Sequence, residues 1–164
     1  MTGVVAWFTG LPSSGKTTLA RAVAGELRLR DIHVVVLDSD DLRTAIVPAL
    51  GYDDVSRQHL YGSLARLAAL IARQGHVVLV PATAHRRAWR DAARGLAPAF
   101  LEIFVDTPKD ECRRRDSKGL YADNVADAPG ITIPYERPTG ADFHIRMGDT
   151  DAAAEIAERL DEMV

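Results

Sequence analysis

Cysteine is nearly absent from the sequence. Cys112 is the single cysteine among 164 residues, so no disulfide can form within the chain, and a secreted domain held together by internal disulfides is excluded. The five histidines, at positions 33, 59, 76, 85 and 144, do not show the spacing of zinc ligands. We therefore expect no zinc, and we expect Cys112 to be a buried, unreactive thiol rather than a nucleophile.

Long apolar runs are lacking as well. No stretch approaches the roughly 20 apolar residues needed to cross a bilayer, and the first apolar run is not preceded by the basic segment of a secretion signal. The charges nearly balance, with a formal net charge of −3, which disfavours a general nucleic-acid binder. These absences predict a cytoplasmic protein with no membrane span and no nucleic-acid partner, whose ligands are small and anionic.

What is present is enough apolar sequence for a core. Hydrophobic residues make up 47% and charged residues 26% of the chain, which suffices for one compact domain over residues 1–164. Strand and helix patterns alternate along it. Strands are predicted at residues 4–9, 34–38, 77–81, 100–106 and 143–147, and helices at residues 17–29, 56–74, 85–94, 108–115 and 151–163. The remaining segment 116–141, rich in glycine and proline, is predicted to be a loop or lid.

This alternation predicts an α/β fold in three layers, with a five-stranded parallel sheet and helices on both of its faces. Ligands of such sheets bind at the carboxyl ends of the strands. The residues that bind ligands should therefore lie at 10–17, at 38–43, at 82–87 and from Asp106 onward. Thr107 is predicted to cap the helix that follows it, with Pro108 at the first helical position.

The segment after the first strand carries the strongest motif. Gly10-Leu11-Pro12-Ser13-Ser14-Gly15-Lys16-Thr17 matches the pattern GxxxxGK[ST] in full, between a predicted strand and a predicted helix. Such a loop wraps its N–H groups around a phosphate, its lysine adds positive charge, and its threonine hydroxyl can ligate Mg²⁺. The sequence thus predicts a P-loop kinase fold that uses ATP and Mg²⁺, the alternative being a chance glycine turn. The residues predicted to bind the cofactor are Gly10, Ser13, Ser14, Gly15, Lys16, Thr17 and Thr18, with Thr17 as the metal ligand.

Two aspartates follow the second predicted strand. Asp40 is predicted, with Lys16, to be catalytic, because its carboxylate can orient or deprotonate an acceptor hydroxyl or hold a metal-bound water. Asp38 is predicted to be a structural partner in the same site. The alternative is that both residues only cap the following helix. A switch ATPase or GTPase is a second alternative, since residues 101–106 also form an apolar strand ending in aspartate. The sequence has no NKxD-like motif for recognising guanine, which favours a kinase.

Taken together, these residues resemble the adenylylsulfate kinases over nearly the whole chain. The resemblance is carried by Trp7-Phe8-Thr9-Gly10-Leu11 before the P-loop, by Val36-Leu37-Asp38-x-Asp40-x-Leu42-Arg43, by Leu50-Gly51-Tyr52 with Arg57, by Glu102-x-Phe104-Val105-Asp106-Thr107-Pro108, by Arg115-Asp116-x-Lys118-Gly119-Leu120-Tyr121, and by Gly130-Ile131 with Pro134-Tyr135-Glu136. The resemblance implies an ATP-dependent transfer of the γ-phosphate to the 3′-hydroxyl of adenylyl sulfate, in sulfate assimilation, by a protein that can form a homodimer.

The resemblance also implies a division of labour between two sides of the site. Arg115 would lie against the adenine of ATP, and Tyr52 would stack on the base of the acceptor, a contact worth roughly 1 to 3 kcal/mol. The residues that would contact the acceptor are Asp38, Arg43, Tyr52, Arg57, Lys118, Leu120 and Ile131. The alternative for Arg43 and Arg57 is a solvated helix face, and the run from Arg113 to Arg115 could instead complement a helix C-terminus.

The chain departs from the family pattern on the acceptor side. Where the family carries an asparagine and two arginines after Arg57, this chain has Leu60, Gly62 and Ser63. The family's Ile-Ser-Pro after the third strand is replaced by Thr83-Ala84-His85, the lid is shorter, and Ala128 stands where a second stacking phenylalanine would fall. These departures leave open a kinase of the same architecture for another nucleotide-linked metabolite or small alcohol. A non-catalytic nucleotide-binding module is the third hypothesis.

Overall fold

The computed structural model describes residues 1–116, 119–122 and 128–164. The strands are β1 (Val4–Thr9), β2 (Val34–Val36), β3 (Val77–Pro81), β4 (Phe100–Asp106) and β5 (Phe143–Arg146). The helices are α1 (Lys16–Leu29), α2 (Ser39–Ala45), α3 (Asp54–Ala72), α4 (Arg87–Leu96), α5 (Lys109–Arg115) and α6 (Ala152–Asp161). Strands and helices alternate, except that two helices, α2 and α3, follow β2, where the sequence predicts one.

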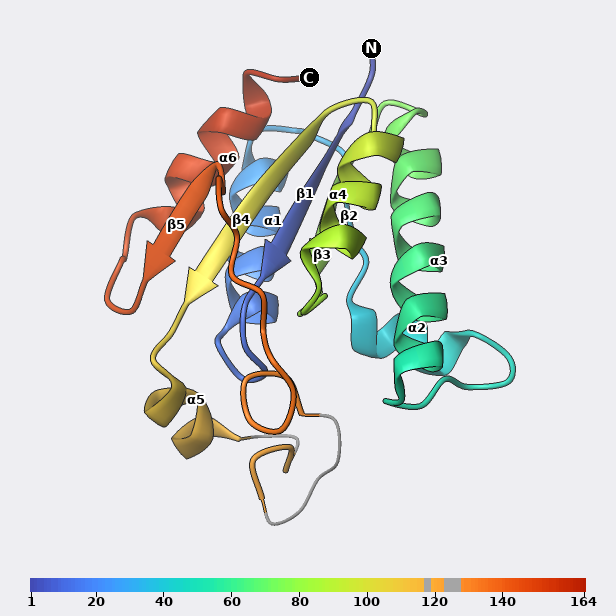
Figure 1. Cartoon of the computed structure of the whole chain (residues 1–164). Coiled ribbons are helices and arrows are strands. Elements are labelled where there is room, and N and C mark those ends of the chain that lie inside the picture. Colours follow the sequence, from blue (N-terminus) through green and yellow to red (C-terminus); the bar gives the residue numbers. More distant parts are fainter. Residues whose placement is uncertain (117–118, 123–127) are drawn as a thin grey trace.

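The five strands form one parallel sheet in the order β2-β3-β1-β4-β5. β1 lies at its centre, so the loop that follows β1 emerges between the ends of β3 and β4. All five strands run toward the same edge, and both termini lie at the opposite end of the molecule (Figure 1). The predicted α/β fold, with helices on both faces of a five-stranded parallel sheet, is confirmed.

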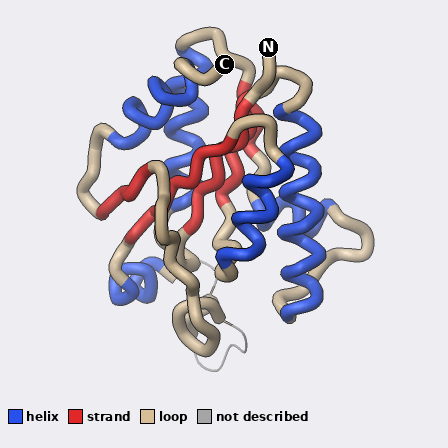
Figure 2. Tube along the Cα trace, turned by 45° about the horizontal axis from the view of Figure 1, so that its top comes forward, coloured by secondary structure: helices blue, strands red, loops and turns tan. Residues whose placement is uncertain are grey.

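The alternation of side chains along β1 explains the three layers. Val4, Ala6 and Phe8 face a core made with α1 and α6, whereas Val5 and Trp7 face a core made with α3 and α4. Every residue of β1 is buried, as expected for a strand covered on both faces. Figure 2 shows the sheet enclosed between these two helical layers. Both cores bring the helices against the sheet and leave its carboxyl edge to the loops.

The second strand is shorter than predicted, and a helix follows it. β2 ends at Val36, and α2 begins at Ser39, with the Asp38 side chain accepting a hydrogen bond from the backbone N–H of Asp40 at 2.9 Å. A carboxylate in this position caps the helix and draws the chain out of the sheet early. The prediction of a strand over residues 34–38 was therefore too long by two residues.

The predicted cap at Thr107 is wrong. α5 begins at Lys109 after Pro108, and no side chain caps it. The buried Thr107 hydroxyl instead donates a 2.7 Å hydrogen bond to the carbonyl of Ser14 in the P-loop. This bond links the end of β4 to the loop after β1, which a local reading of the sequence could not reveal because the partners are 93 residues apart.

Cys112 lies on the inner side of α5 and is fully buried. Burial raises the pKa of its thiol above the ordinary value. The expectation of a buried thiol is confirmed, and the raised pKa keeps the sulfur in its less reactive protonated form. Separately, none of the helices in the described part of the chain has the length and apolarity that crossing a lipid bilayer requires.

Candidate active site

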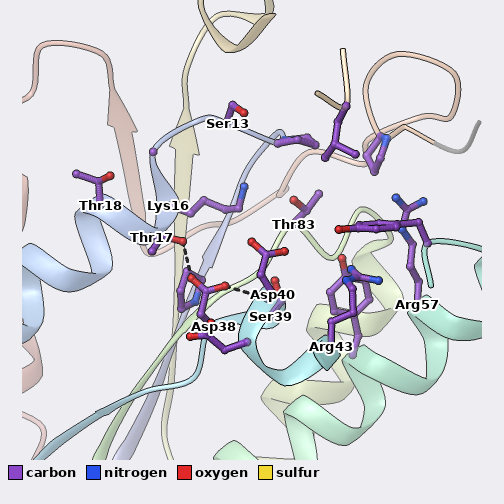
Figure 3. A pocket seen from close by; sticks show the side chains of 18 of the residues that line it. Ser13, Lys16, Thr17, Thr18, Asp38, Ser39, Asp40, Arg43, Arg57 and Thr83 are labelled. Carbon is purple, nitrogen blue, oxygen red and sulfur yellow. Dashed lines mark hydrogen bonds between the residues drawn. The ribbon is translucent and has the colours of Figure 1, made fainter. Parts of the chain in front are cut away.

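A cavity of about 450 Å³ opens at the carboxyl edge of the sheet. Its walls come from the loop after β1, from α2, from the start of α3 and from the segment after β3. Most of the residues predicted for the site lie around it (Figure 3). The predicted residues that line it are Ser13, Gly15, Lys16, Thr17, Thr18, Asp38, Asp40, Arg43, Tyr52, Arg57, Arg115 and Leu120.

Two glycines shape the P-loop. A side chain at Gly10 would place its Cβ 2.5 Å from the carbonyl oxygen of Val105, so the loop can pass close to β4 only without one. Gly15 has a φ of 98°, in the left-handed region that L side chains rarely adopt. It directly precedes α1, and this arrangement turns the N-terminus of a 14-residue helix toward the cavity. Such an end favours an anion.

Lys16 projects from the first turn of α1 over its own loop. Its ammonium group donates hydrogen bonds to the carbonyl of Leu11 at 2.7 Å and to that of Gly10 at 3.2 Å. The positive charge is thereby held at the mouth of the loop, on the side of the cavity where Asp40 also lies (Figure 3). A mobile ammonium in this place can follow a phosphate group as its charge changes.

Thr17 and Asp38 place a hydroxyl and a carboxylate side by side next to the P-loop. The Thr17 hydroxyl donates a 2.7 Å hydrogen bond to Oδ2 of Asp38, whose Oδ1 accepts the backbone N–H of Asp40. Because the hydroxyl proton is directed at Asp38, the lone pairs of Thr17 are available to a cation. Hydroxyl and carboxylate oxygens suit Mg²⁺, which keeps several waters and phosphate oxygens as its remaining ligands. The residues present therefore fit a magnesium ion bound at Thr17.

Asp38 has the structural position predicted from its place after the second strand, and its contact with the acceptor stays a prediction. It lies on the P-loop side, fixed by Thr17 and by the N-terminus of α2, and only 7% of it is exposed. Asp40, the second residue of α2, lines the same cavity as Lys16 and is only half-buried. The alternative that both aspartates are caps holds for Asp38 alone.

Arg43 and Arg57 are not solvated, so that alternative is wrong. They are 7% and 4% exposed, and both line the cavity. Arg43 donates a hydrogen bond to the carbonyl of Gly51, and its guanidinium lies 4.0 Å from the centre of the Tyr52 ring. The guanidinium of Arg57 lies 5.7 Å from the same ring. The Nε of Arg43 is buried without a hydrogen-bond partner among the described residues.

Arg115 lies between this cavity and a second one of about 490 Å³ on the α1 side of the P-loop. Glu111, one turn earlier on α5, accepts a 2.9 Å hydrogen bond from Arg115. Hydrogen bonds from Arg114 and then Arg115 lower the pKa of Glu111 to about 2. Arg115 is therefore oriented by Glu111 beside Gly15, and it does not simply complement the end of its helix.

A few predicted residues lie elsewhere. Ser14 lines the second cavity, and Gly10, the first residue of the P-loop, lies against β4. Ile131 is half-buried in a turn that begins at Ala128, and it lines neither of the two cavities. Lys118 falls outside the described residues.

The departures from the family pattern have visible consequences. Leu60 and Ala84 are buried apolar residues of the α3 and α4 core, and Gly62 and Ser63 line a separate surface depression on α3. Ala128 is 1% exposed and does not reach the main cavity. None of these residues supplies a polar group to the acceptor side.

Sequence reasoning missed several residues that line the two cavities. Among them, Tyr61 and Thr83 line the main cavity, and the segment 146–150, at the end of β5 and after it, lines the second cavity. Thr83 lies in the segment 82–87, where the sequence predicts ligand-binding residues because it follows a strand of a parallel sheet. The sequence therefore indicated the segment but not the residue. Tyr61 reads as one more apolar position of a helix, and the segment 146–150 carries no motif.

Comparisons with known proteins agree on one family. The family model described as adenylylsulphate kinase matches residues 2–146. An adenylyl-sulfate kinase of Synechococcus is 41% identical over 140 residues, which cover 83% of this chain and 80% of that protein. The bifunctional enzyme NodQ of Azospirillum brasilense is 40% identical over 98% of this chain.

Among solved structures, the Mycobacterium tuberculosis APS kinase CysC, in complex with AMPPNP and APS, superposes with a TM-score of 0.88. It is 35% identical to this chain, and the match covers 99% of this chain and 97% of that one. The chain spans about a quarter of the length of the bifunctional relatives, 27% in the case of NodQ.

Proposed function

The chain belongs to the adenylylsulfate kinase family, and from this premise we propose that it transfers the γ-phosphate of ATP to the 3′-hydroxyl of adenylyl sulfate, a step of sulfate assimilation. The observation that carries the proposal is the main cavity, in which the P-loop and two buried arginines face one another across Asp40. The P-loop side suits a polyphosphate, and the arginine side suits the phosphosulfate anion of the acceptor.

The residues divide the work as follows. The loop Gly10 to Thr17 and the Lys16 ammonium hold the phosphates of ATP, and Arg115 lies against its adenine. Arg43 and Arg57 bind the acceptor anion, and Tyr52 and Leu120 contact its nucleoside. Lys118 and Ile131, which the resemblance also implies, remain predictions. When Mg²⁺ is bound at Thr17, it neutralises the phosphate charge.

Asp40 orients the 3′-hydroxyl and accepts its proton as the oxygen attacks the γ-phosphorus in line with the departing ADP. The bond from the acceptor oxygen to phosphorus forms as the bond from phosphorus to the bridging oxygen of ADP breaks. Little covalent chemistry falls to the protein in such a reaction, so positioning and charge stabilisation carry most of the rate.

The direct test is the release of ADP from Mg·ATP with adenylyl sulfate as the acceptor and AMP as the control. The expected product is phosphorylated at the 3′-hydroxyl, which phosphorus NMR distinguishes from other positions. ADP release that is the same with AMP, or without any acceptor, would contradict the proposal.

A second candidate is a kinase of the same architecture for another nucleotide-linked metabolite or a small alcohol. It is favoured by the loss of polar groups at Leu60, Gly62 and Ala84, since a site that cannot hydrogen-bond its substrate loses discrimination. Efficient turnover of another alcohol with negligible turnover of adenylyl sulfate would select this candidate.

A homodimer and a cytoplasmic location remain predictions of the resemblance and of the composition. Light scattering on the purified chain tests the first, and fractionation of cells that express it tests the second.

A further inference from the structure

One polar side chain of the main cavity has no role in the proposed mechanism. Thr83 follows β3 by two residues, between the P-loop after β1 and the aspartates after β2. Its side chain is half-buried and lines the cavity together with Lys16 and Asp40. In Figure 3 it projects into the space that these two residues border.

The backbone around Thr83 is held from several directions. The Thr83 carbonyl accepts a 2.7 Å hydrogen bond from the Thr9 hydroxyl, and the carbonyl of Ala82 accepts one of 3.1 Å from the indole of Trp7. Ala84 has a φ of 39°, and its carbonyl accepts a 2.5 Å hydrogen bond from the buried Arg90. A strained residue that its surroundings hold in place is a mark of functional sites.

The Thr83 hydroxyl makes no hydrogen bond within the part of the chain that the structure describes. Among residues 1–116, 119–122 and 128–164, the Thr83 carbonyl accepts a hydrogen bond while no partner is recorded for the Thr83 hydroxyl. The buried Arg90, which lies next to this segment, donates hydrogen bonds to Glu102 and to the backbone carbonyls of Ala84 and Glu136. A hydroxyl held in place beside the transfer centre, with no partner among the described residues, is available to a substrate.

We propose that Thr83 is a specificity-determining contact for the acceptor, and that its hydroxyl binds the hydroxyl adjacent to the one that is phosphorylated. The inference rests on the proposed function. When Asp40 takes the proton of the 3′-hydroxyl, the neighbouring 2′-hydroxyl of the ribose lies beside it, on the part of the cavity wall that Thr83 forms. A contact to the neighbour orients the sugar without weakening the attacking oxygen. The acceptor class is therefore a sugar with vicinal hydroxyls.

The test compares Thr83→Val, Thr83→Ser and the wild type on adenylyl sulfate and on 2′-deoxyadenylyl sulfate. Valine keeps the shape of threonine and removes the hydroxyl. Since a hydrogen bond between uncharged groups is worth about 0.5–1.5 kcal/mol, Thr83→Val should lower kcat/KM on adenylyl sulfate about 3- to 10-fold. The KM for ATP should not change, and Thr83→Ser should stay within about twofold of the wild type.

On the 2′-deoxy acceptor the wild type should lose about the same factor, and Thr83→Val should cause no further loss. Thr139→Val, at an exposed threonine outside the cavities, is the matched control. Equal losses from Thr83→Val on both acceptors, or no loss on either, would overturn the inference while leaving the proposed function intact. A folded, ATP-binding wild type that does not use adenylyl sulfate would overturn the proposed function and this contact with it.

Discussion

The phosphate side and the acceptor side of the main cavity are built in different ways. The phosphate side comes from one continuous segment, residues 10–18, braced by Asp38 and Thr107. The acceptor side is assembled from α2, from Tyr52, from α3 and from the segment after β3. A continuous segment keeps its geometry through local hydrogen bonds, whereas an assembled wall depends on how separate elements pack.

This difference explains where the chain departs from its family. The phosphate segment matches the full motif, while the departures at Leu60, Gly62, Ala84 and Ala128 fall in or next to the segments that supply the assembled wall, although none of the four lines the cavity. There, two buried arginines remain and the hydroxyls of Tyr61 and Thr83 are present. Burial raises the pKa of Tyr61, so this hydroxyl stays protonated. Recognition of the acceptor therefore depends on fewer charged side chains than the family pattern provides. Variants on the phosphate side and variants on the acceptor side should change different kinetic parameters.

The largest effect is expected at the boundary between the two sides. Asp40→Asn should reduce kcat on adenylyl sulfate about 10²- to 10⁴-fold, because the amide cannot accept the proton of the acceptor hydroxyl. Binding of ATP should change little, and titration calorimetry beside steady-state kinetics measures both quantities. Asp91→Asn, on the exposed side of α4, is the control. A kcat within twofold of the wild type would remove Asp40 from the mechanism.

On the phosphate side, Lys16→Ala should lower kcat about 10²- to 10³-fold through the loss of charge stabilisation. The KM for adenylyl sulfate should remain close to the wild-type value, since Lys16 does not belong to the acceptor wall. ADP release at saturating acceptor gives the comparison, with the exposed Lys109→Ala as the matched lysine variant. Normal turnover by Lys16→Ala would mean that the P-loop assignment is wrong.

On the acceptor side, Arg57→Lys should raise the KM for adenylyl sulfate about 10- to 100-fold and leave the KM for ATP unchanged. A lysine keeps the charge but loses the planar fork that binds an anion through two hydrogen bonds. Arg66→Lys, on the exposed face of the same helix, is the control. If the KM for ATP rose equally, the separation of the two sides would not hold.

The smallest effect concerns stability. Burial, and then the charge of Arg57, lowers the pKa of His85 to about 4. The unfolded chain binds this proton below about pH 6.5 and the folded chain only near pH 4, so the contribution of His85 is complete above pH 6.5 and is lost as the pH falls toward 4. His85→Gln should therefore lose less Tm than the wild type between pH 7 and pH 5.

Scanning calorimetry at the two pH values measures this difference, with the exposed His59→Gln as the control. An equal fall in Tm for the wild type and His85→Gln would show that His85 titrates alike in the folded and unfolded chains.

Most of the fold followed from the sequence, because its signals are local. The P-loop needs only eight consecutive residues, and the strands need only apolar runs between glycine, proline and charge. One error arose because a side chain has a distant partner. Thr107 reads as a helix cap until Ser14 is placed beside it. For Arg43 and Arg57, the alternative of a solvated helix face is excluded only when Tyr52 and the cavity wall are seen to cover them.

The sequence by itself determined the order of strands and helices, the phosphate loop and the resemblance to one family. Each of these depends on residues close together in the chain. Only the tertiary structure decided that Asp38 serves Thr17, that the two arginines are buried, and that Thr83 borders the same cavity as Asp40. Parallel strands bring together loops separated by dozens of residues, and no local pattern records which side chains meet at their ends.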